Sequence, residues 1–309
     1  MYAHDRGERA GDPPAAVFQT LAHPIRERVL ATLAAADDGL RYEPLRERVD
    51  VGDNGKFNYH LGELRDRFVE RRDGRYHLTS VGQRAHELVA AGTLGTVRTG
   101  RTFETRSSCL ECGARLEATY DGVTFRLDCP ACGSCFRSVR FPPGGVATRD
   151  DEALLDAVDT AVRRDLSSLG RGVCPRCAGR VAVDATTADW RRGDGPRSLA
   201  FGFEYDCREC RAGWTATAGE VVLDHPAVVG FYHDHGVDLR DRYAWDLEFA
   251  ATDHDTRVRS RDPLRLELRP QCGNDELVVV LDSDGSVVRT SRHTKFTARG
   301  TWFDRPVES

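Results

Sequence analysis

The chain has 309 residues, of which 44 are Lys or Arg and 49 are Asp or Glu, giving a formal net charge of −5. This balance excludes a chain-wide basic surface for nucleic acid, and 13 Phe, 8 Tyr and 4 Trp exclude a wholly disordered chain. No apolar run approaches the roughly 20 residues of a membrane span and no signal-peptide pattern is visible, so we expect a cytoplasmic protein with no membrane partner. Ten cysteines in such a chain favour metal binding or redox chemistry over disulfides.

The first hundred residues predict a small helical domain that is closed by a hairpin. Apolar residues recur with helical spacing, and Pro24 interrupts the first run. In chain order we expect two helices over residues 15–36 separated at His23-Pro24, a third over 42–49, a fourth capped within Asp53-Asn54-Gly55, a hairpin over 68–78 turning at Asp73-Gly74, and a helix over 80–91 capped by Thr79.

This order of elements is that of a winged helix-turn-helix. The run LAHPIRERVL at residues 21–30 resembles the opening of ArsR-type transcriptional regulators, and KFNYHLGEL at residues 56–64 resembles their recognition helix. Only Lys56 and Lys295 are Lys, and 31 Asp exceed 18 Glu, a composition that resembles proteins of halophilic archaea. The likeness is strongest to the haloarchaeal branch with a Cys-rich C-terminal extension. It implies a winged helix-turn-helix over residues 13–96 that binds double-stranded DNA as a homodimer.

The predicted recognition helix and wing carry the candidate DNA-contacting residues. Asn can pair with adenine in the major groove, Lys can donate to guanine or phosphate, and Arg around the wing turn suits backbone or minor-groove contacts. Metal-sensing ArsR-type proteins place Cys in the preceding helix, but residues 45–49 contain none, so arsenic or cadmium sensing there is not expected. His60 is expected to pack or to contact phosphate rather than bind metal. The candidates are Asn54, Lys56, Asn58, Tyr59, His60, Glu63, Arg65, Arg71, Arg72 and Arg75.

Eight of the ten cysteines form two sets of paired C-x-x-C motifs. Each motif brings two thiolates about one tetrahedral edge apart, and two motifs joined by strands complete a four-thiolate site of the zinc-ribbon kind. We therefore expect two structural zinc ions per chain, with iron–sulfur ligation or a redox dithiol as alternatives. Cys135 is either a free thiol or a substitute for Cys132, and Cys272 is expected to take no part. The predicted ligands are Cys109, Cys112, Cys129 and Cys132 in the first site and Cys174, Cys177, Cys207 and Cys210 in the second.

The predicted fold class is therefore α+β with several domains. After the winged helix-turn-helix we expect a zinc ribbon over residues 97–145, a linking helix over 146–172, a second ribbon over 173–223, and a helix plus β-meander over 224–300. The meander strands are expected over residues 245–250, 257–260, 264–268, 277–282 and 286–290. The apolar stripe of the linking helix requires a ribbon or a second subunit as partner. Arg163 and Arg164 on this helix are expected to be solvated.

The function we expect is that of a DNA-binding transcriptional regulator and not of an enzyme, because four thiolates leave zinc no open position. The alternative is a zinc-ribbon adaptor that binds RNA or the transcription machinery. Residues 224–300 are a candidate site for an unknown effector or protein partner. A weaker third possibility is a hydrolytic metal site built from His233-Asp234-His235 and Asp253-His254-Asp255.

Overall fold

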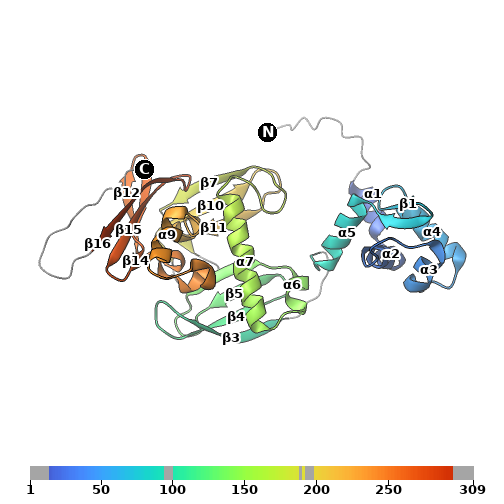
Figure 1. Ribbon diagram of the computed structural model, residues 1–309, viewed down its shortest axis with the longest axis horizontal. Helices are drawn as coiled ribbons and strands as arrows, with labels where there is room; N and C mark the ends of the chain where they lie inside the picture. The colour runs from blue at the N-terminus through green and yellow to red at the C-terminus, as the bar shows by residue number, and fades with distance from the viewer. Residues whose placement is uncertain (1–13, 94–99, 188–189, 192–197, 295–309) are drawn as a thin grey trace, which may run out of the picture. The chain divides into compact units, whose positions relative to one another are not determined.

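The computed structural model describes residues 14–93, 100–187, 190–191 and 198–294, so the ends of the predicted segments at 94–96 and 295–300 lie outside it. The protein mixes α-helices with several small antiparallel sheets. It divides into two units, residues 1–96 and 97–309 (Figure 1). No described helix combines the length and the apolar character that crossing a membrane would need.

The first unit contains the five helices and the hairpin that the apolar spacing predicts. Pro24 begins the second helix, and the side chain of His23 caps it by accepting the backbone N–H of Ile25 at 3.1 Å. Asp53 and Thr79 cap the fourth and fifth helices in the same way. The elements are α1 (Pro14–Leu21), α2 (Pro24–Ala34), α3 (Tyr42–Val49), α4 (Asn54–Leu64), β1 (Val69–Arg72), β2 (Arg75–Leu78) and α5 (Ser80–Ala90).

The core of this unit determines which face of α4 remains outside. Phe57 and Leu64 are fully buried together with residues of α2, α3 and β1, and Leu61 is 3% exposed. These positions repeat with the helical period, so the opposite face of α4 is left in solvent. The hairpin turns through Asp73 and Gly74 with φ of 48° and 76°, the left-handed pair that a tight two-residue turn requires.

The second unit is built around three main antiparallel sheets. The first has the strand order β3-β4-β5-β6, the second β11-β10-β7, and the third β12-β13-β15-β14 with β16 also paired to β15. The strands are β3 (Arg101–Ser108), β4 (Arg115–Tyr120), β5 (Thr124–Asp128), β6 (Cys135–Arg140), β7 (Val181–Thr186), β10 (Gly202–Cys207), β11 (Gly213–Ala216), β12 (Thr256–Arg261), β13 (Leu264–Leu268), β14 (Gln271–Cys272), β15 (Asp275–Asp282) and β16 (Val287–Thr294), with a further short pair, β8 (Trp190–Arg191) and β9 (Ser198–Leu199).

Helix α7 (Asp151–Leu169) lies along the first two sheets (Figure 1). Leu154, Leu155 and Val158 pack into the core of the first sheet, whereas Leu169 belongs to the core shared by the second and third sheets. The linking helix thus has the first cysteine-bearing sheet as a partner, one of the two possibilities expected. The remaining helices are α6 (Pro143–Ala147), α8 (Ala218–Val221), α9 (Pro226–Asp234), α10 (Glu248–Ala251), η1 (Leu239–Asp241) and η2 (Ala244–Asp246).

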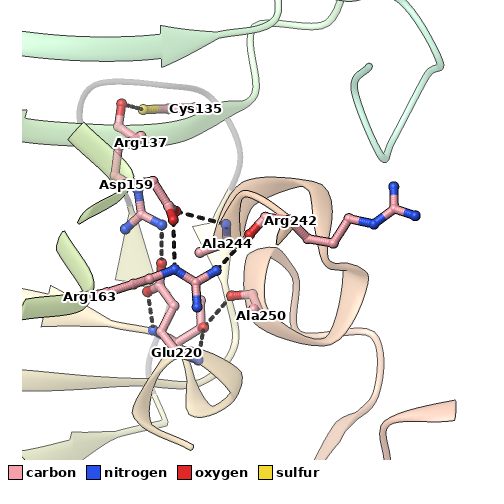
Figure 2. Close-up of polar contacts among 9 residues, drawn as sticks. Cys135, Arg137, Asp159, Arg163, Glu220, Arg242, Ala244 and Ala250 are labelled. Carbon is pink, nitrogen blue, oxygen red and sulfur yellow. Dashed lines mark hydrogen bonds and ion pairs between the residues drawn. The ribbon is translucent and has the colours of Figure 1, made fainter. Parts of the chain in front are cut away.

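A buried ion pair joins the first sheet to α8 (Figure 2). Arg137 on β6 lies 2.5 Å from Glu220, and their side chains are only 4% and 0% exposed. Glu220 also accepts the backbone N–H of Thr217 at 2.9 Å as part of a capping box. Because each charge is removed from water, each depends on the other for its stabilisation.

A second polar cluster corrects the expectation that Arg163 is solvated (Figure 2). Its side chain is 14% exposed and lies 2.6 Å from Asp159, and it donates to the backbone carbonyl of Arg242 at 2.7 Å. Asp159 in turn accepts the backbone N–H of Ala244 at 2.9 Å. Arg163 therefore fastens the loop after α9 to α7, while Arg164, 72% exposed, does lie in solvent.

Residues 245–250 form no strand, which is a second correction. Trp245, Leu247 and Phe249 alternate in the sequence and so imitate a strand, but the chain runs through η2 and α10. Trp245 and Phe249 are also one helical turn apart, and both are buried, at 0% and 2% exposed. The indole N–H of Trp245 donates to Ser107 at 3.1 Å, which satisfies its polar atom inside the core.

Replacing Arg137 by Met should destabilise the protein by about 3–5 kcal/mol, because Glu220 would be left as an uncompensated buried charge. Urea unfolding of the full chain measures this change. The double variant Arg137→Met/Glu220→Gln should recover much of the loss, since it removes both charges. The control is Arg164→Met, which breaks an exposed pair and should change stability by about 0.5 kcal/mol or less. Equal effects of the two single variants would show that the buried pair is unimportant.

Candidate functional sites

The first four predicted ligands converge on one point at the end of the first sheet. Cys109 and Cys112 precede β4, and Cys129 and Cys132 lie between β5 and β6. Sulfur–sulfur distances are 3.6 Å from Cys109 to Cys132 and 3.5 Å from Cys112 to Cys129, and all four sulfur atoms lie within 4.8 Å of one another. A tetrahedron with metal–sulfur bonds of about 2.3 Å has edges of roughly 3.8 Å. This set could therefore hold a metal ion.

The second set repeats this arrangement at the end of the second sheet. Cys174 lies 3.7 Å from Cys210, and Cys177 lies 3.5 Å from Cys207, sulfur to sulfur. All four sulfur atoms again lie within 4.8 Å of one another. The two groups are the only ones among the described residues in which three or more His, Cys, Asp or Glu ligand atoms gather in this way.

All four C-x-x-C motifs share one backbone turn. The N–H of the residue after the second cysteine donates to the carbonyl of the first, at 2.8 Å for Gly113 and Gly133, 2.9 Å for Ala178 and 3.1 Å for Arg211. Each of these four residues has a φ between 58° and 76°. Glycine adopts this left-handed conformation freely, whereas Ala178 and Arg211 adopt it against a steric cost of about 1–2 kcal/mol.

Burial alternates within each motif, and this affects the thiols of the first site. The first cysteine is buried, at 3% exposed for Cys109, and the second is exposed. Burial raises the pKa of Cys109 to about 12. Burial acts in the same direction on Cys132, but hydrogen bonds with the side chain and backbone of Ser134 outweigh it and lower the pKa to about 6.

The second site shows a similar contrast between neighbouring thiols. The backbone N–H of Ala212 lowers the pKa of Cys210 to about 7. The backbone N–H of Gly179 acts to lower the pKa of Cys177, but hydrogen bonding with Cys210, burial and hydrogen bonding with the other two thiols together outweigh it and raise the pKa to about 12. In each set one thiol therefore releases its proton readily while another retains it, and a bound cation would replace the retained protons.

The two remaining cysteines lie outside these sets. Cys135 begins β6, and its thiol donates to the backbone carbonyl of Arg137 at 3.3 Å. Cys132 and not Cys135 completes the first set, which decides between the two possibilities left open by the sequence. Cys272 lies in the short strand β14, in neither set.

Most of the predicted DNA-contacting residues are exposed on α4 and the hairpin. Asn54, Lys56, Asn58 and Glu63 are exposed on α4, and 59% of Tyr59 is exposed. Arg65, Arg71, Arg72 and Arg75 are also exposed. Arg72 forms a close ion pair with Glu70, and Arg75 donates to the backbone carbonyl of Gly39 at 3.3 Å.

His60 is the one candidate that lies in the interior. It is 5% exposed, and its ring stacks on His23 at a centroid distance of 3.8 Å. Its Nδ1 accepts a hydrogen bond from Nε of Arg26 at 3.3 Å, and burial together with the neighbouring His23 lowers its pKa. Of the two roles expected for His60, the structure therefore favours packing. Arg26 also lies 3.8 Å from Glu63, so this cluster fixes α4 on α2.

The two His- and Asp-containing triplets do not assemble into a hydrolytic site. His235 lies 2.9 Å from Asp275, and Asp234 pairs with Arg292. His254 contacts Glu111 and Glu248, at 3.3 Å each. The triplets thus have separate partners and share no group of potential metal ligands within the described ranges.

The sequence indicated that Gly or a small residue relieves the tight turn of a C-x-x-C motif, but sequence reasoning missed that Arg211 takes this place after the fourth motif. Its left-handed conformation closes the turn that aims both thiols at one point. Comparing the four motifs with one another provides the missing signal, since Gly, Gly, Ala and Arg occupy the same place. No pattern in the sequence indicated that Ser134 would form a hydrogen bond with Cys132.

These features define a two-unit α+β protein whose larger unit contains two four-cysteine centres. Residues 106–287 match the model of a family described as a domain of unknown function, DUF7351, and the protein belongs to this family because the match covers more than half of the chain. Residues 14–89 match a second model, described as a domain of unknown function, DUF7347. No curated protein and no solved structure matches the chain.

Elemental analysis of the full chain should find close to two metal ions per molecule if both cysteine sets are metal centres. Changing the exposed ligand Cys112 to Ser should reduce this number to about one, because three thiolates and a hydroxyl bind a soft metal weakly. The matched control is Cys135→Ser, which changes a nearby cysteine outside the set and should leave the metal content unaltered. A metal content that is independent of Cys112 would contradict the assignment.

Proposed function

We propose that this protein is a DNA-binding transcriptional regulator that reads the major groove with a winged helix-turn-helix in its first unit. The observation that carries the proposal is the two-sided character of α4. Phe57, Leu61 and Leu64 hold one face in the core, and Asn54, Lys56, Asn58 and Tyr59 project from its N-terminal half into solvent. A helix presented in this way, followed by a hairpin with exposed Arg, suits insertion into a groove with the hairpin on the backbone.

The charge of the first unit indicates how it would bind. Residues 13–92 contain 12 Lys or Arg and 12 Asp or Glu, so this segment has no net charge. Long-range attraction to phosphate is then weak, and affinity has to come from close contacts at α4 and the hairpin. Tyr59 and the Arg residues at the hairpin are the candidates for those contacts. Such binding tolerates high salt better than binding through a basic field does.

We also propose that the protein acts as a homodimer. Large apolar side chains remain exposed on α1 and α5, with Phe18 64%, Val81 48%, Leu88 46% and Val89 40% exposed. Large apolar side chains exposed on two helices of one small unit favour a partner surface. A two-fold dimer would double the close contacts on a palindromic target, which compensates for the missing net charge.

For the metal we propose structural zinc in both centres, each forming a zinc ribbon with its sheet. Thiolates are soft ligands that select zinc, and the 3.5–3.7 Å spacings fit a single tetrahedral ion. A multi-iron cluster needs room for its own sulfide ions between the cysteines. Four thiolates saturate zinc, so these centres would supply stability and not catalysis.

The decisive test is selection of a target from random double-stranded DNA by the full chain at high potassium, followed by a mobility-shift titration. Asn58→Ala and Lys56→Ala should each weaken binding to the selected sequence by about tenfold, because each removes a base or phosphate contact. The control is Arg164→Ala, which removes an exposed charge from α7, outside α4, the hairpin and the exposed apolar residues of α1 and α5, and should leave affinity unchanged.

Two outcomes would contradict this proposal. Specific binding that is retained in both α4 variants would place the reading surface elsewhere. Failure to select any sequence, with binding to RNA or to transcription proteins instead, would favour a zinc-ribbon adaptor.

A further inference from the structure

A cavity of about 520 Å³ lies between the two cysteine-bearing sheets of the second unit. Its walls come from β5 and β6 of the first sheet, from the C-terminal half of α7, and from β10 and β11 of the second sheet. Ligand sites in proteins usually measure roughly 300–1,000 Å³ and lie where structural modules meet. The size and the position of this cavity are both those of a binding site for a small molecule.

The lining of the cavity combines an apolar wall with an aromatic platform. Phe141, Leu169 and Tyr205 contribute buried apolar surface, at 8%, 2% and 3% exposed. Trp214 on β11 is half-buried, and the guanidinium of Arg176 lies over its ring at 5.4 Å from the centroid. A flat group is therefore already stacked on the indole, and a planar ligand ring could extend or replace that stack.

Three arginines of the lining have charges that no described residue neutralises. Arg140, Arg176 and Arg211 are exposed and form no ion pair with any other residue in the described part of the chain. The remaining arginine of the lining, Arg137, is neutralised by Glu220. Guanidinium groups in this state are suited to bidentate binding of a phosphate or carboxylate.

The lining also carries acceptors for a polar ligand. Glu204 and Asp206, on β10, are exposed and have no ion-pair partner in the described ranges, whereas Asp165 pairs with Arg164 at 2.8 Å. Three free guanidinium groups against two free carboxylates leave a small positive excess. This balance favours a ligand with one anionic group and additional hydroxyl or amino donors over a polyanion.

The backbone of Arg211 provides an independent indication that its side chain matters. Arg211 has a φ of 60°, in the left-handed region, at the position where both motifs of the first site have Gly. An arginine there costs about 1–2 kcal/mol relative to an unstrained residue, and glycine would fold the same turn without that cost. Residues that are kept in such a conformation occur preferentially at functional sites.

We propose that this cavity binds a small molecule with a flat aromatic ring and one anionic group, of the chemical class of a nucleoside monophosphate. Arg140 and Arg211 bind the anion, the ring stacks on Trp214, and the carboxylates of Glu204 and Asp206 accept hydrogen bonds from ligand donors. The site lies wholly within the second unit and does not depend on the proposed DNA binding. Because Arg176 lies between Cys174 and Cys177, and Arg211 follows Cys210, occupancy would directly engage the second cysteine centre.

The test is isothermal titration of the full chain with AMP, GMP, CMP and UMP, and with adenosine and inorganic phosphate as the separate components. At least one monophosphate should bind more tightly than adenosine or phosphate alone, because it engages both the arginines and the indole. Absence of binding by all four monophosphates at millimolar concentration would overturn the proposal. So would binding of every monophosphate no tighter than that of adenosine, since the arginines would then contribute nothing.

The decisive variant is Arg211→Gly, because ligand binding and folding are expected to respond differently to it. Removing the guanidinium should weaken binding by about tenfold, as loss of one charge-assisted hydrogen bond does. The thermal midpoint of the same variant should be no lower than that of the parent, because glycine relieves the left-handed strain.

A second variant, Arg140→Gln, should weaken binding by a similar factor. The matched control is Arg208→Gln, an exposed residue of the same cysteine motif outside the cavity, which should bind as the parent does. Unchanged affinity in Arg211→Gly would refute the assigned role.

Discussion

The convergence of four sulfur atoms at each of two points is the constraint on which the second unit depends. Each set joins turns that are far apart in the sequence, and Cys109 and Cys129 are themselves members of the core of the first sheet. If the thiols hold a metal ion, part of the binding free energy becomes folding free energy, since no such site exists in the unfolded chain. The small sheets then require less apolar burial to be stable than their size would otherwise demand.

Around these centres the second unit is held together by a few contacts between distant segments. Helix α7 contributes to two hydrophobic cores, the Arg137–Glu220 pair fastens β6 to α8, and Arg163 fixes the loop after α9. The cavity between the two cysteine-bearing sheets is bounded by α7 and by the strand that carries Arg137. The contacts that hold the sheets together therefore also help to set its shape.

Local patterns in the sequence predicted a large part of this structure. Apolar spacing located the five helices of the first unit, and the C-x-x-C motifs identified the eight cysteines that gather. The prediction failed at residues 245–250, because their apolar pattern is compatible with two structures. Trp245 and Phe249 would lie on one face of a strand and also on one face of a helix. The prediction also failed for Arg163 and the cavity, because their partners are separated from them along the chain and only tertiary packing brings them together.

The alternation of buried and exposed cysteines gives each four-sulfur centre an inner and an outer side. The sulfurs of Cys174 and Cys207 belong to residues that are 2% and 1% exposed, whereas Cys177 and Cys210 lie at the surface. A competing chelator can approach an ion held there from the surface side alone. Exchange of the ion with its surroundings would then begin at the two outer sulfurs, while the inner pair remains attached to the fold until the last step.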